Sequence, residues 1–498
     1  MASGGGEHSE VSFIGIDIGT SSVKAVLAGE DQAILAEADV PLATDRPQPG
    51  WSEQAPDDWW RAVVAALGRI QDLQPAPYAA TRAVGLSGQM HGAVLLDAGD
   101  RPIRPAILWN DSRSHAECQD LMRAVPDLDV RAGVPAMPGL TAPKLLWLER
   151  HEPENFRRIA RVMLPKDFVR LKLTGEHATD MSDAAGTLWL DEARRDWYPA
   201  AVAASGLALA ALPRLVEGIE PTGRLRPEVA AQLGLSDRVV VAGGAGDAAA
   251  GAVGIGAIAE GDAFLSLGNS AQYLVVRESY RPCRQGVVHA FAHAVPQRWF
   301  QMAALLSGAS CLKWFAGAVG SADIDGLLAR VAARGKDPSP VLFLPYLAGE
   351  RTPHDDPFAR GVFFGLAPDT TTEDLARSVL EGVAFSLVDG RDAIAAAAPV
   401  PSRLAAIGGG SRSRLWIEII ASALGQPISV HDSSRMGPAF GAARLARLAA
   451  TGGDVAAACP RPRATATIEP DAGLAARYAD LLPRFRSLYA ALRPLFRP

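Results

Sequence analysis

The chain has 498 residues, of which 48% are hydrophobic and 21% charged, a composition typical of globular domains that excludes a disordered or fibrous chain. Its formal net charge of −6 argues against a general nucleic-acid or anionic-membrane binder, which needs a basic face, so we expect small-molecule partners, no nucleic acid and no membrane. The four cysteines show no C-x-x-C spacing, which predicts neither a zinc site nor a disulfide framework and favours a cytoplasmic location.

The first ten residues, MASGGGEHSE, contain no basic segment followed by an apolar one, so we predict no export signal. We exclude them from the fold and leave open whether they are native. The longest apolar stretch, residues 200–212, is interrupted by Ser205 and Gly206. It is shorter than the ~18–20 residues that span a bilayer.

Residues 11–18 and 23–27 have a strand pattern and flank a turn at Gly19, Thr20, Ser21 and Ser22, which predicts a β-hairpin. Asp17 lies inside the first strand, where an ionised carboxylate is costly unless it is paired or near a metal ion. The amides and hydroxyls of the turn, with Lys24 close by, favour a phosphate-binding hairpin. A purely structural hairpin is the alternative.

A second hairpin is predicted from residues 263–267 and 272–276, which flank a turn at Gly268, Asn269 and Ser270. Ser270 corresponds to Ser21 at an offset of about half the chain, which indicates an internally duplicated protein with two domains.

Two further strands lead into glycine turns that precede helices. Residues 238–242 precede a glycine-rich turn that ends at Asp247, and residues 404–407 precede Gly408, Gly409 and Gly410. This alternation predicts α/β domains with sites at the strand-to-helix turns. Asp247 is interpreted as a ligand-facing carboxylate or as a helix cap. Helices are predicted over residues 55–67, 372–385 and 478–495, and the domain boundary near residues 254–256.

Two segments have the side chains that a polyhydroxylated ligand requires. Met90 and His91 stand between glycines, and Trp109, Asn110 and Asp111 follow a short strand pattern. A ring can cover C–H groups while amide and carboxylate groups bond hydroxyls. The alternatives are a core histidine for His91 and a solvated loop for Trp109 to Asp111.

Longer motifs resemble the FGGY family of carbohydrate kinases over nearly the whole chain. The two family signatures are followed by residues 139–148 (GLTAPKLLWL) and by residues 361–366 (GVFFGL) with their continuation to Glu381. The resemblance implies an α/β fold of two actin/hexokinase-like (ribonuclease H-like) domains, 11–255 and 256–498, with the active site in the interdomain cleft. It also implies a homodimer, because relatives are often dimers.

The resemblance implies ATP as phosphoryl donor, Mg²⁺ as cofactor and a role for each candidate residue. Asp247 matches the catalytic base and Asp17 the carboxylate that helps to hold magnesium. Met90, His91, Trp109, Asn110 and Asp111 are expected to contact the sugar. The phosphate loops are expected at Gly19, Thr20, Ser21 and Lys24 and at Gly268, Asn269 and Ser270, and the adenosine-binding turn at Gly408, Gly409 and Gly410.

Six segments favour the bacterial members that phosphorylate D-xylulose in xylose catabolism over the glycerol and gluconate branches. They are residues 51–60, 88–98, 104–111, 142–154, 180–187 and 344–354. The alternatives are a family kinase for another ketose or a polyol, such as ribulose or an alditol, and a non-catalytic sugar- or nucleotide-binding homologue. An actin-like assembly protein is disfavoured, because the sugar-type segments would have no purpose. Ala248, Asn269 and Ala271 depart from residues common in the family.

Overall fold

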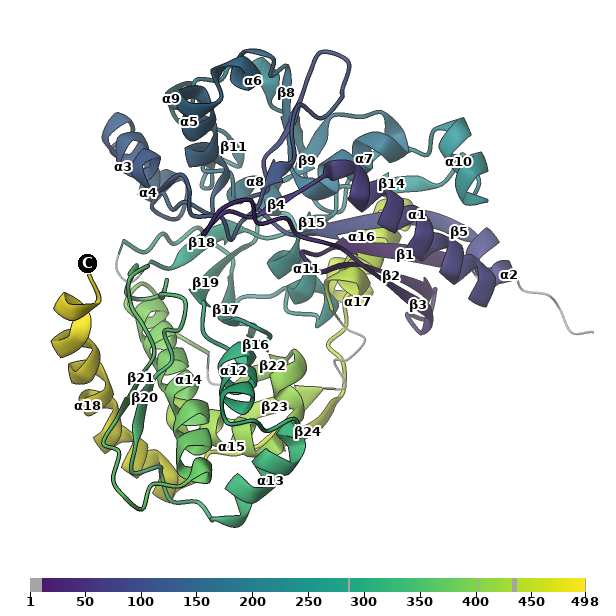
Figure 1. Cartoon of the computed structure of the whole chain (residues 1–498). Helices are drawn as coiled ribbons and strands as arrows, with labels where there is room; N and C mark the ends of the chain where they lie inside the picture. Colours follow the sequence, from purple (N-terminus) through teal and green to yellow (C-terminus); the bar gives the residue numbers. More distant parts are fainter. Residues whose placement is uncertain (1–10, 285–286, 402, 432–436, 498) are drawn as a thin grey trace, which may run out of the picture. The chain divides into compact units, whose positions relative to one another are not determined.

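The computed structural model describes residues 11–284, 287–401, 403–431 and 437–497. The first ten residues, for which we predict no export signal, lie outside the described part. The chain forms two compact units, whose elements are labelled in Figure 1. Unit 1 contains the described residues within Met1–Ile258, Phe291–Trp299 and Arg435–Arg461, and unit 2 those within Ala259–Ala290, Phe300–Ser434 and Pro462–Pro498. The chain therefore leaves unit 1 and re-enters it twice. The family domains 11–255 and 256–498 stay a prediction.

The main sheet of unit 1 has the order β13-β14-β5-β1-β2-β3, and the short strand β15 also pairs with β5. These strands are β1 Ser12–Ile18, β2 Ser22–Gly29, β3 Ile34–Pro41, β5 Thr81–Gly88, β13 Pro221–Arg224, β14 Val240–Ala242 and β15 Ala245–Gly246. The predicted first hairpin is confirmed, because β1 and β2 pair antiparallel with Asp17 opposite Lys24.

Alternate residues of β1 face different helices, as the pleat of a strand requires. Ile14 and Ile16 pack in the core with α1 (Pro56–Leu73), α7 (Pro165–Thr174) and α10 (Pro227–Leu233). Phe13 packs with α16 (Pro438–Thr451), and Gly15 lies against the backbone of the same helix. Asp17 has the parity of Phe13 and Gly15, so it belongs to the face that α16 covers.

Helix α16 belongs to unit 1 although it comes late in the chain, and in Figure 1 it lies in yellow-green among the purple strands. Glycines allow its backbone to approach closely. A Cβ added to Gly15 would lie 1.9 Å from Ala439 O, and one added to Gly441 would lie 1.8 Å from Ala250 O of α11 (Asp247–Gly254). The same helix therefore packs against the strand of Asp17 and the helix that begins at Asp247.

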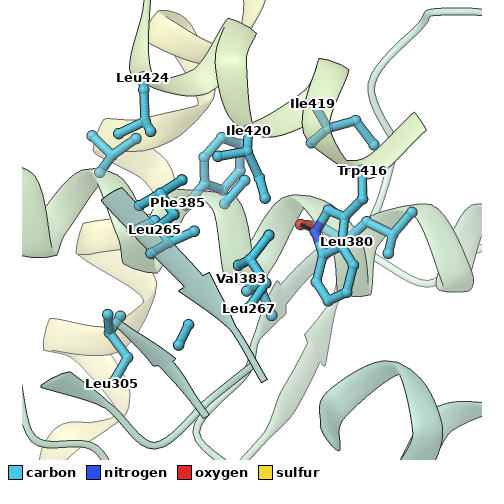
Figure 2. Close-up of a cluster of buried hydrophobic side chains, with 14 of the residues drawn as sticks. Leu265, Leu267, Leu305, Leu380, Val383, Phe385, Trp416, Ile419, Ile420 and Leu424 are labelled. Atoms are coloured by element: carbon cyan, nitrogen blue, oxygen red, sulfur yellow. Dashed lines mark hydrogen bonds between the residues drawn. The ribbon is translucent and has the colours of Figure 1, made fainter. Parts of the chain in front are cut away.

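The second large sheet, most of whose residues belong to unit 2, has the order β18-β19-β17-β16-β22-β23-β24. Its strands are β16 Ala263–Leu267, β17 Ala271–Arg277, β18 His289–Ala292, β19 Trp299–Leu305, β22 Leu404–Ile407, β23 Ile428–His431 and β24 Ala464–Ile468. The predicted second hairpin is confirmed by the antiparallel pairing of β16 and β17. Figure 2 shows Leu265 and Leu267 of β16 in a buried cluster with Val383 of α14 (Thr372–Ala395) and Trp416 of α15 (Arg414–Leu424).

The remaining elements are shorter or lie outside these sheets. The helices are α2 Pro75–Ala79, α3 His115–Ala124, α4 Leu128–Arg131, α5 Thr141–His151, α6 Pro153–Arg157, α8 Met181–Ala185, α9 Pro199–Ala204, α12 Ala309–Ala318, α13 Ile324–Ala333, α17 Val455–Ala458 and α18 Ala472–Phe496, with 3₁₀ turns at Leu209–Ala211 and Gly409–Arg412. The strands are β4 Glu53–Gln54, β6 Val94–Leu96, β7 Ala106–Ile107, β8 Arg161–Met163, β9 Ala178–Asp180, β10 Leu190–Asp191, β11 Asp196–Trp197, β12 Arg214–Val216, β20 Leu342–Leu344 and β21 Val362–Phe364.

The three predicted helices are present but longer than expected, as α1, α14 and α18. Helix α14 continues past Phe385 through Gly390 to Ala395, and an added Cβ at Gly390 would lie 2.9 Å from the Ala303 side chain. Helix α18 begins earlier than predicted, since the Asp471 side chain accepts a hydrogen bond from Leu474 N and caps it. Among the described residues, no helix is long and apolar enough to cross a membrane.

Candidate functional site

Asp17 and Asp247 lie in the same unit, on opposite sides of strand β5. Asp17 of β1 is paired with Ser87, and Gly246 of β15 is paired with Gly88, in two parallel ladders. Neighbouring strands lie ~4.8 Å apart. The backbones of Asp17 and Gly246, one strand away from β5 on either side, therefore lie about 10 Å from each other at the carboxyl edge of the sheet. The carboxyl ends of parallel strands are where α/β sheets bind ligands.

The Asp17 carboxylate is held in a partly buried position. Burial raises its pKa to about 6, although the Ser87 hydroxyl donates a hydrogen bond of 2.9 Å to Oδ1 and the Lys24 ammonium attracts the charge. Lys24 is the cross-strand neighbour of Asp17 and also forms an ion pair of 3.6 Å with Glu37. The site therefore favours a cation that could stabilise the Asp17 anion.

Asp247 is the first residue of α11, and Gly246 occupies the capping position, so Asp247 does not cap the helix. Burial raises its pKa to about 7, and the negative charge of Asp17 adds to the rise. The Ala248 amide donates a hydrogen bond of 2.7 Å to Oδ1 and opposes it. A carboxyl group with a pKa near neutrality can exchange a proton with a bound hydroxyl group.

This raised pKa makes folding stability depend on pH. Because the folded-state pKa lies above the unfolded value, Asp247 stabilises the fold fully below pH 3.8 and loses that contribution as the pH rises through about 7. We expect the unfolding free energy of Asp247→Asn, taken relative to wild type, to rise by about 3 kcal/mol from pH 5 to pH 8. Denaturant titrations at both pH values measure this gain. Asp325→Asn, in the first turn of α13, is the control, and its difference from wild type should be the same at both pH values. An equally constant difference for Asp247→Asn would contradict the raised pKa.

Met90 lies beside Gly246, the residue before Asp247, and His91 lies beside Gly186. A Cβ added to Gly246 would lie 2.8 Å from Met90 Cγ, so the Met90 side chain packs against the residue that precedes Asp247. His91 has φ of 72° and forms a hydrogen bond of 3.0 Å from Nδ1 to the Gly186 carbonyl oxygen. Since a carbonyl only accepts, Nδ1 carries the proton in the neutral ring.

The segment from Trp109 to Asp111 is anchored rather than solvated. Asp111 is buried and accepts hydrogen bonds from Ser52 N and from Arg113, whose guanidinium forms an ion pair of 2.7 Å with it. Asn110 Oδ1 is buried and accepts no hydrogen bond from the described residues. The Asp111 carboxylate thus holds the loop, whereas the Asn110 amide retains an unused acceptor.

Loop 1, formed by Gly19, Thr20 and Ser21, is held by Gln54 and Gln89, which are not among the candidate residues predicted from the sequence. The Thr20 hydroxyl donates to Gln89 Oε1 and accepts from Trp109 Nε1, both at 2.9 Å. Gln54 Nε2 donates to Thr20 O at 2.7 Å, and Gln89 Nε2 donates to Gln54 Oε1 at 2.9 Å. These bonds connect the predicted phosphate loop to the predicted sugar-binding ring. Gln54 lies in the segment 51–60 and Gln89 in the segment 88–98. Both segments carry the family resemblance, so the resemblance could have indicated these two residues.

Loop 2, formed by Gly268, Asn269 and Ser270, lies in unit 2 at the end of β16. Its carbonyl groups accept hydrogen bonds from the first turn of α12, Gly268 O from Ala309 N at 2.8 Å and Asn269 O from Ser310 N at 3.2 Å. Both acceptors are backbone carbonyl groups. The attachment of loop 2 to α12 therefore does not depend on the side chain of Asn269, which departs from the residue common in the family.

The turn of Gly408, Gly409 and Gly410 lies next to loop 2, because β22 pairs in parallel with β16. Gly408 has φ of 89°, and a Cβ added there would lie 2.9 Å from the backbone of Leu267. Only Gly409 has an open side, since its nearest neighbour is the end of the Arg412 side chain at 3.9 Å. The turn therefore packs tightly at its ends and offers a bare backbone at Gly409.

The candidate residues thus form two groups. Asp17, Asp247, Met90, His91, Trp109 and loop 1 belong to unit 1, and loop 2 and the glycine turn belong to unit 2. Groups of three or more carboxylate, histidine or cysteine side chains arranged to hold a metal ion do not occur among the described residues. A magnesium ion that keeps most of its waters and binds substrate phosphates requires only one or two carboxylates, so Asp17 fits such an ion.

Comparison with known proteins identifies the family. The model of the FGGY carbohydrate kinase N-terminal domain matches residues 12–254, and that of the C-terminal domain matches residues 263–450. The chain is 47% identical to a xylulose kinase of Escherichia coli over 97% of this chain and 99% of that protein, and 45% identical to a xylulose kinase of Klebsiella pneumoniae over 97% and 99%.

Solved structures agree with the sequence relatives. A structure described as a "xyloylose kinase" from Brucella ovis has a TM-score of 0.92 and 46% identity, and covers 97% of this chain and 100% of that one. A xylulose kinase from Rhodospirillum rubrum has a TM-score of 0.89 and 30% identity, and covers 97% and 99%. The predicted α/β fold of two actin/hexokinase-like domains is confirmed. The chain belongs to the FGGY family of carbohydrate kinases.

Proposed function

We propose that this chain transfers the γ-phosphoryl group of ATP to the 5-hydroxyl group of D-xylulose, giving ADP and D-xylulose 5-phosphate. One observation carries the proposal. Asp247 lies across β5 from Asp17 with a pKa raised to about 7, and Met90 packs against Gly246, the residue before it. The relatives described as xylulose kinases match along nearly the full chain, which favours this sugar.

Asp247 acts as general base in this proposal. Its ionised carboxylate accepts the proton of the 5-hydroxyl as that oxygen bonds to the γ-phosphorus, and the bond from phosphorus to the β–γ bridging oxygen breaks to release ADP. Phosphoryl transfer depends mainly on alignment and charge stabilisation. A base with a pKa near the working pH suits the proton transfer.

Asp17 would hold magnesium, which neutralises phosphate charge when bound. Lys24 lies opposite Asp17 and would attract the phosphates. Loop 1 would offer amides to ATP, since the Thr20 hydroxyl already donates to Gln89. Loop 2 would contact further phosphate oxygens through Asn269 and Ser270. The glycine turn would receive adenosine where Gly409 leaves the backbone bare.

The sugar would lie against His91, Trp109 and Asn110. In neutral His91, Nε2 carries the lone pair and can accept a hydrogen bond from a sugar hydroxyl. Asn110 Oδ1 is a buried acceptor that a second hydroxyl could satisfy, and the Trp109 ring can cover C–H groups. Asp111 would act indirectly, because its hydrogen bond with Arg113 fixes the loop that carries Trp109 and Asn110.

Replacement of His91 tests the sugar site. We expect His91→Ala to raise the KM for D-xylulose about 10- to 100-fold, as loss of a buried hydrogen bond implies, and to leave the KM for ATP nearly unchanged. Steady-state kinetics with each substrate varied in turn measure both constants. His115→Ala, which removes an exposed histidine at the start of α3, is the control. A change confined to the KM for ATP would remove His91 from the sugar site.

A substrate panel tests the proposed reaction itself. ADP release is measured with D-xylulose, ribulose and other pentuloses, and with alditols, each at matched concentration. We expect the highest kcat/KM with D-xylulose and little ADP release without sugar. A clear preference for another sugar would replace xylulose while retaining the kinase. Nucleotide binding without sugar-dependent ADP release would favour a non-catalytic homologue.

Cellular location and assembly form a separate proposal. We propose a cytoplasmic homodimer, from the family resemblance and from the cysteines, because Cys118, Cys283, Cys311 and Cys459 form no disulfide bond in the described part of the chain. Light scattering on the purified protein measures the assembly, and a monomer at working concentrations would contradict the dimer.

A further inference from the structure

The segment 180–187 (DMSDAAGT) lies beside the candidate site although no catalytic role has been assigned to it. Each of its residues is buried, and it contains the short helix α8 (Met181–Ala185). The Asp180 carboxylate caps this helix by accepting hydrogen bonds from Ser182 N and Asp183 N. The segment is therefore a rigid part of unit 1.

The Ser182 side chain joins this segment to the turn before Asp247. Its hydroxyl donates a hydrogen bond of 2.5 Å to Asp180 Oδ2 and accepts one of 3.1 Å from Gly246 N. Gly246 is the capping residue of α11, so Ser182 holds the amide immediately before the proposed base. Glycine has no side chain that could hold this turn, which leaves its backbone groups as the points of attachment.

The other end of the turn is held by Arg170, a fully buried residue of α7. Its guanidinium donates hydrogen bonds to Ala242 O and Gly243 O, and it also approaches Asp167 Oδ1 at 3.4 Å. The turn that leads to Asp247 is thus fixed at both ends by α7 and α8.

Both attachments rest on one buried ionic cluster. Lys166 Nζ lies 2.6 Å from Asp167 Oδ1, 2.8 Å from Asp180 Oδ1 and 3.2 Å from Asp183 Oδ2, and all four side chains are fully buried. Buried charges are costly, and breaking such a pair is strongly destabilising, so the cluster constrains its members to one arrangement. Ser182 is attached to the cluster through Asp180, and Arg170 through Asp167.

The same segment also orients His91. The Gly186 carbonyl, one residue after α8, bonds His91 Nδ1 at 3.0 Å. An added Cβ at Gly186 would lie 2.1 Å from that nitrogen, so only glycine leaves room for the ring. One segment thus contacts both the proposed base turn and the proposed sugar ligand.

We propose that Ser182 is a positioning residue for Asp247, holding the Gly246 amide, and with it the first turn of α11, on the frame of Lys166, Asp167 and Asp180. The proposal rests on the proposed role of Asp247 as base. A base displaced by a fraction of an ångström loses alignment with the hydroxyl group, which lowers turnover more than substrate binding.

The test compares steady-state kinetics of Ser182→Ala and wild type with D-xylulose and ATP. We expect kcat to fall about 10- to 100-fold while both KM values change by less than about 3-fold, because the sugar and nucleotide contacts remain. Ser182→Cys keeps the size of the side chain but weakens both hydrogen bonds, and its kcat should lie between the two. It also keeps the test decisive if Ser182→Ala does not fold.

Ser205→Ala is the matched control. Ser205 is also fully buried in unit 1, and its hydroxyl makes two hydrogen bonds, from Trp189 Nε1 and to Ala201 O, both at 2.9 Å. Its loss should lower Tm as much as the loss of Ser182 but leave kcat unchanged. Equal kcat values for the Ser182 and Ser205 variants would overturn the positioning role.

Asp247→Ala is measured in the same assay, so that the two proposals can fail separately. If Asp247→Ala turns over normally, the proposed base is wrong whatever Ser182 does. If Asp247→Ala is inactive and both Ser182 variants turn over like wild type, only the positioning role is wrong.

Discussion

Replacing Asp247 with alanine should lower kcat about 10²- to 10⁴-fold, the range by which a positioned general base accelerates a reaction. The structure gives the physical reason. Burial and the charge of Asp17 raise the Asp247 pKa to about 7, so near neutral pH the carboxylate is ionised in part and is a far stronger base than an exposed aspartate. Binding of D-xylulose and ATP should persist, because loop 1, His91 and Trp109 are retained. Steady-state kinetics and calorimetric titration measure the two effects.

Two further variants separate chemistry from structure. Asp247→Asn keeps the shape of the side chain but cannot accept the proton, so it should be as inactive as the alanine variant. Asp325→Ala removes another aspartate from the first turn of a helix, α13, and should leave kcat unchanged. Turnover of Asp247→Ala near the wild-type rate would contradict the assignment of the base.

Gly85→Ala should destabilise unit 1 by about 3 kcal/mol or more, at the upper end of the cost of overpacking. Gly85 lies in β5, between the strands that lead to Asp17 and Asp247, and a Cβ added there would lie 1.9 Å from Ala442 O of α16. The Ala442 oxygen belongs to the backbone and the new Cβ is bonded directly to the backbone of residue 85, so no side-chain rotation relieves the clash. Denaturant titration measures the loss.

The matched control is Gly68→Ala in α1, where an added Cβ meets nothing within 4 Å. Alanine is the better helix former, so this variant should gain about 0.5–1 kcal/mol. If Gly85→Ala were as stable as wild type, the close packing of α16 against β5 would be wrong.

The local elements could be predicted because the signals lie in adjacent residues. Alternation around Asp17 and the glycine turn at Gly19 predict a hairpin whatever the rest of the chain does. The same holds for the hairpin at Gly268 and for the strand that precedes Gly408. Asp17 stood out because a carboxylate inside an apolar strand needs a partner, and the structure gives it Ser87 and Lys24.

What could not be predicted depends on pairing between distant segments. The parallel ladders of β1 and β15 with β5 bring Asp17 and Asp247 to one edge, yet their partners lie about 70 and 160 residues away in the chain. Helix α16 joins unit 1 because Gly15 and Gly85 leave room for its backbone, and a glycine within a strand pattern is only a general sign of close approach.

The hydrogen-bond networks of the side chains could not be predicted from the sequence either. Gln54, Gln89 and Ser182 are ordinary polar residues in the sequence, and only the fold shows that they hold Thr20 and Gly246. The departures from the family pattern became interpretable in the same way. The Ala248 amide bonds Asp247, a contact that does not depend on the side chain at position 248.

A crystal structure of the Asp247→Asn variant with D-xylulose, Mg²⁺ and a non-hydrolysable ATP analogue would test the central claim most directly. We predict that the 5-hydroxyl oxygen of the sugar lies within about 2.6–3.2 Å of the side chain of residue 247, the range for direct proton transfer. It should face the γ-phosphorus of the analogue. A different hydroxyl at residue 247, or a sugar bound away from it, would contradict the proposed reaction.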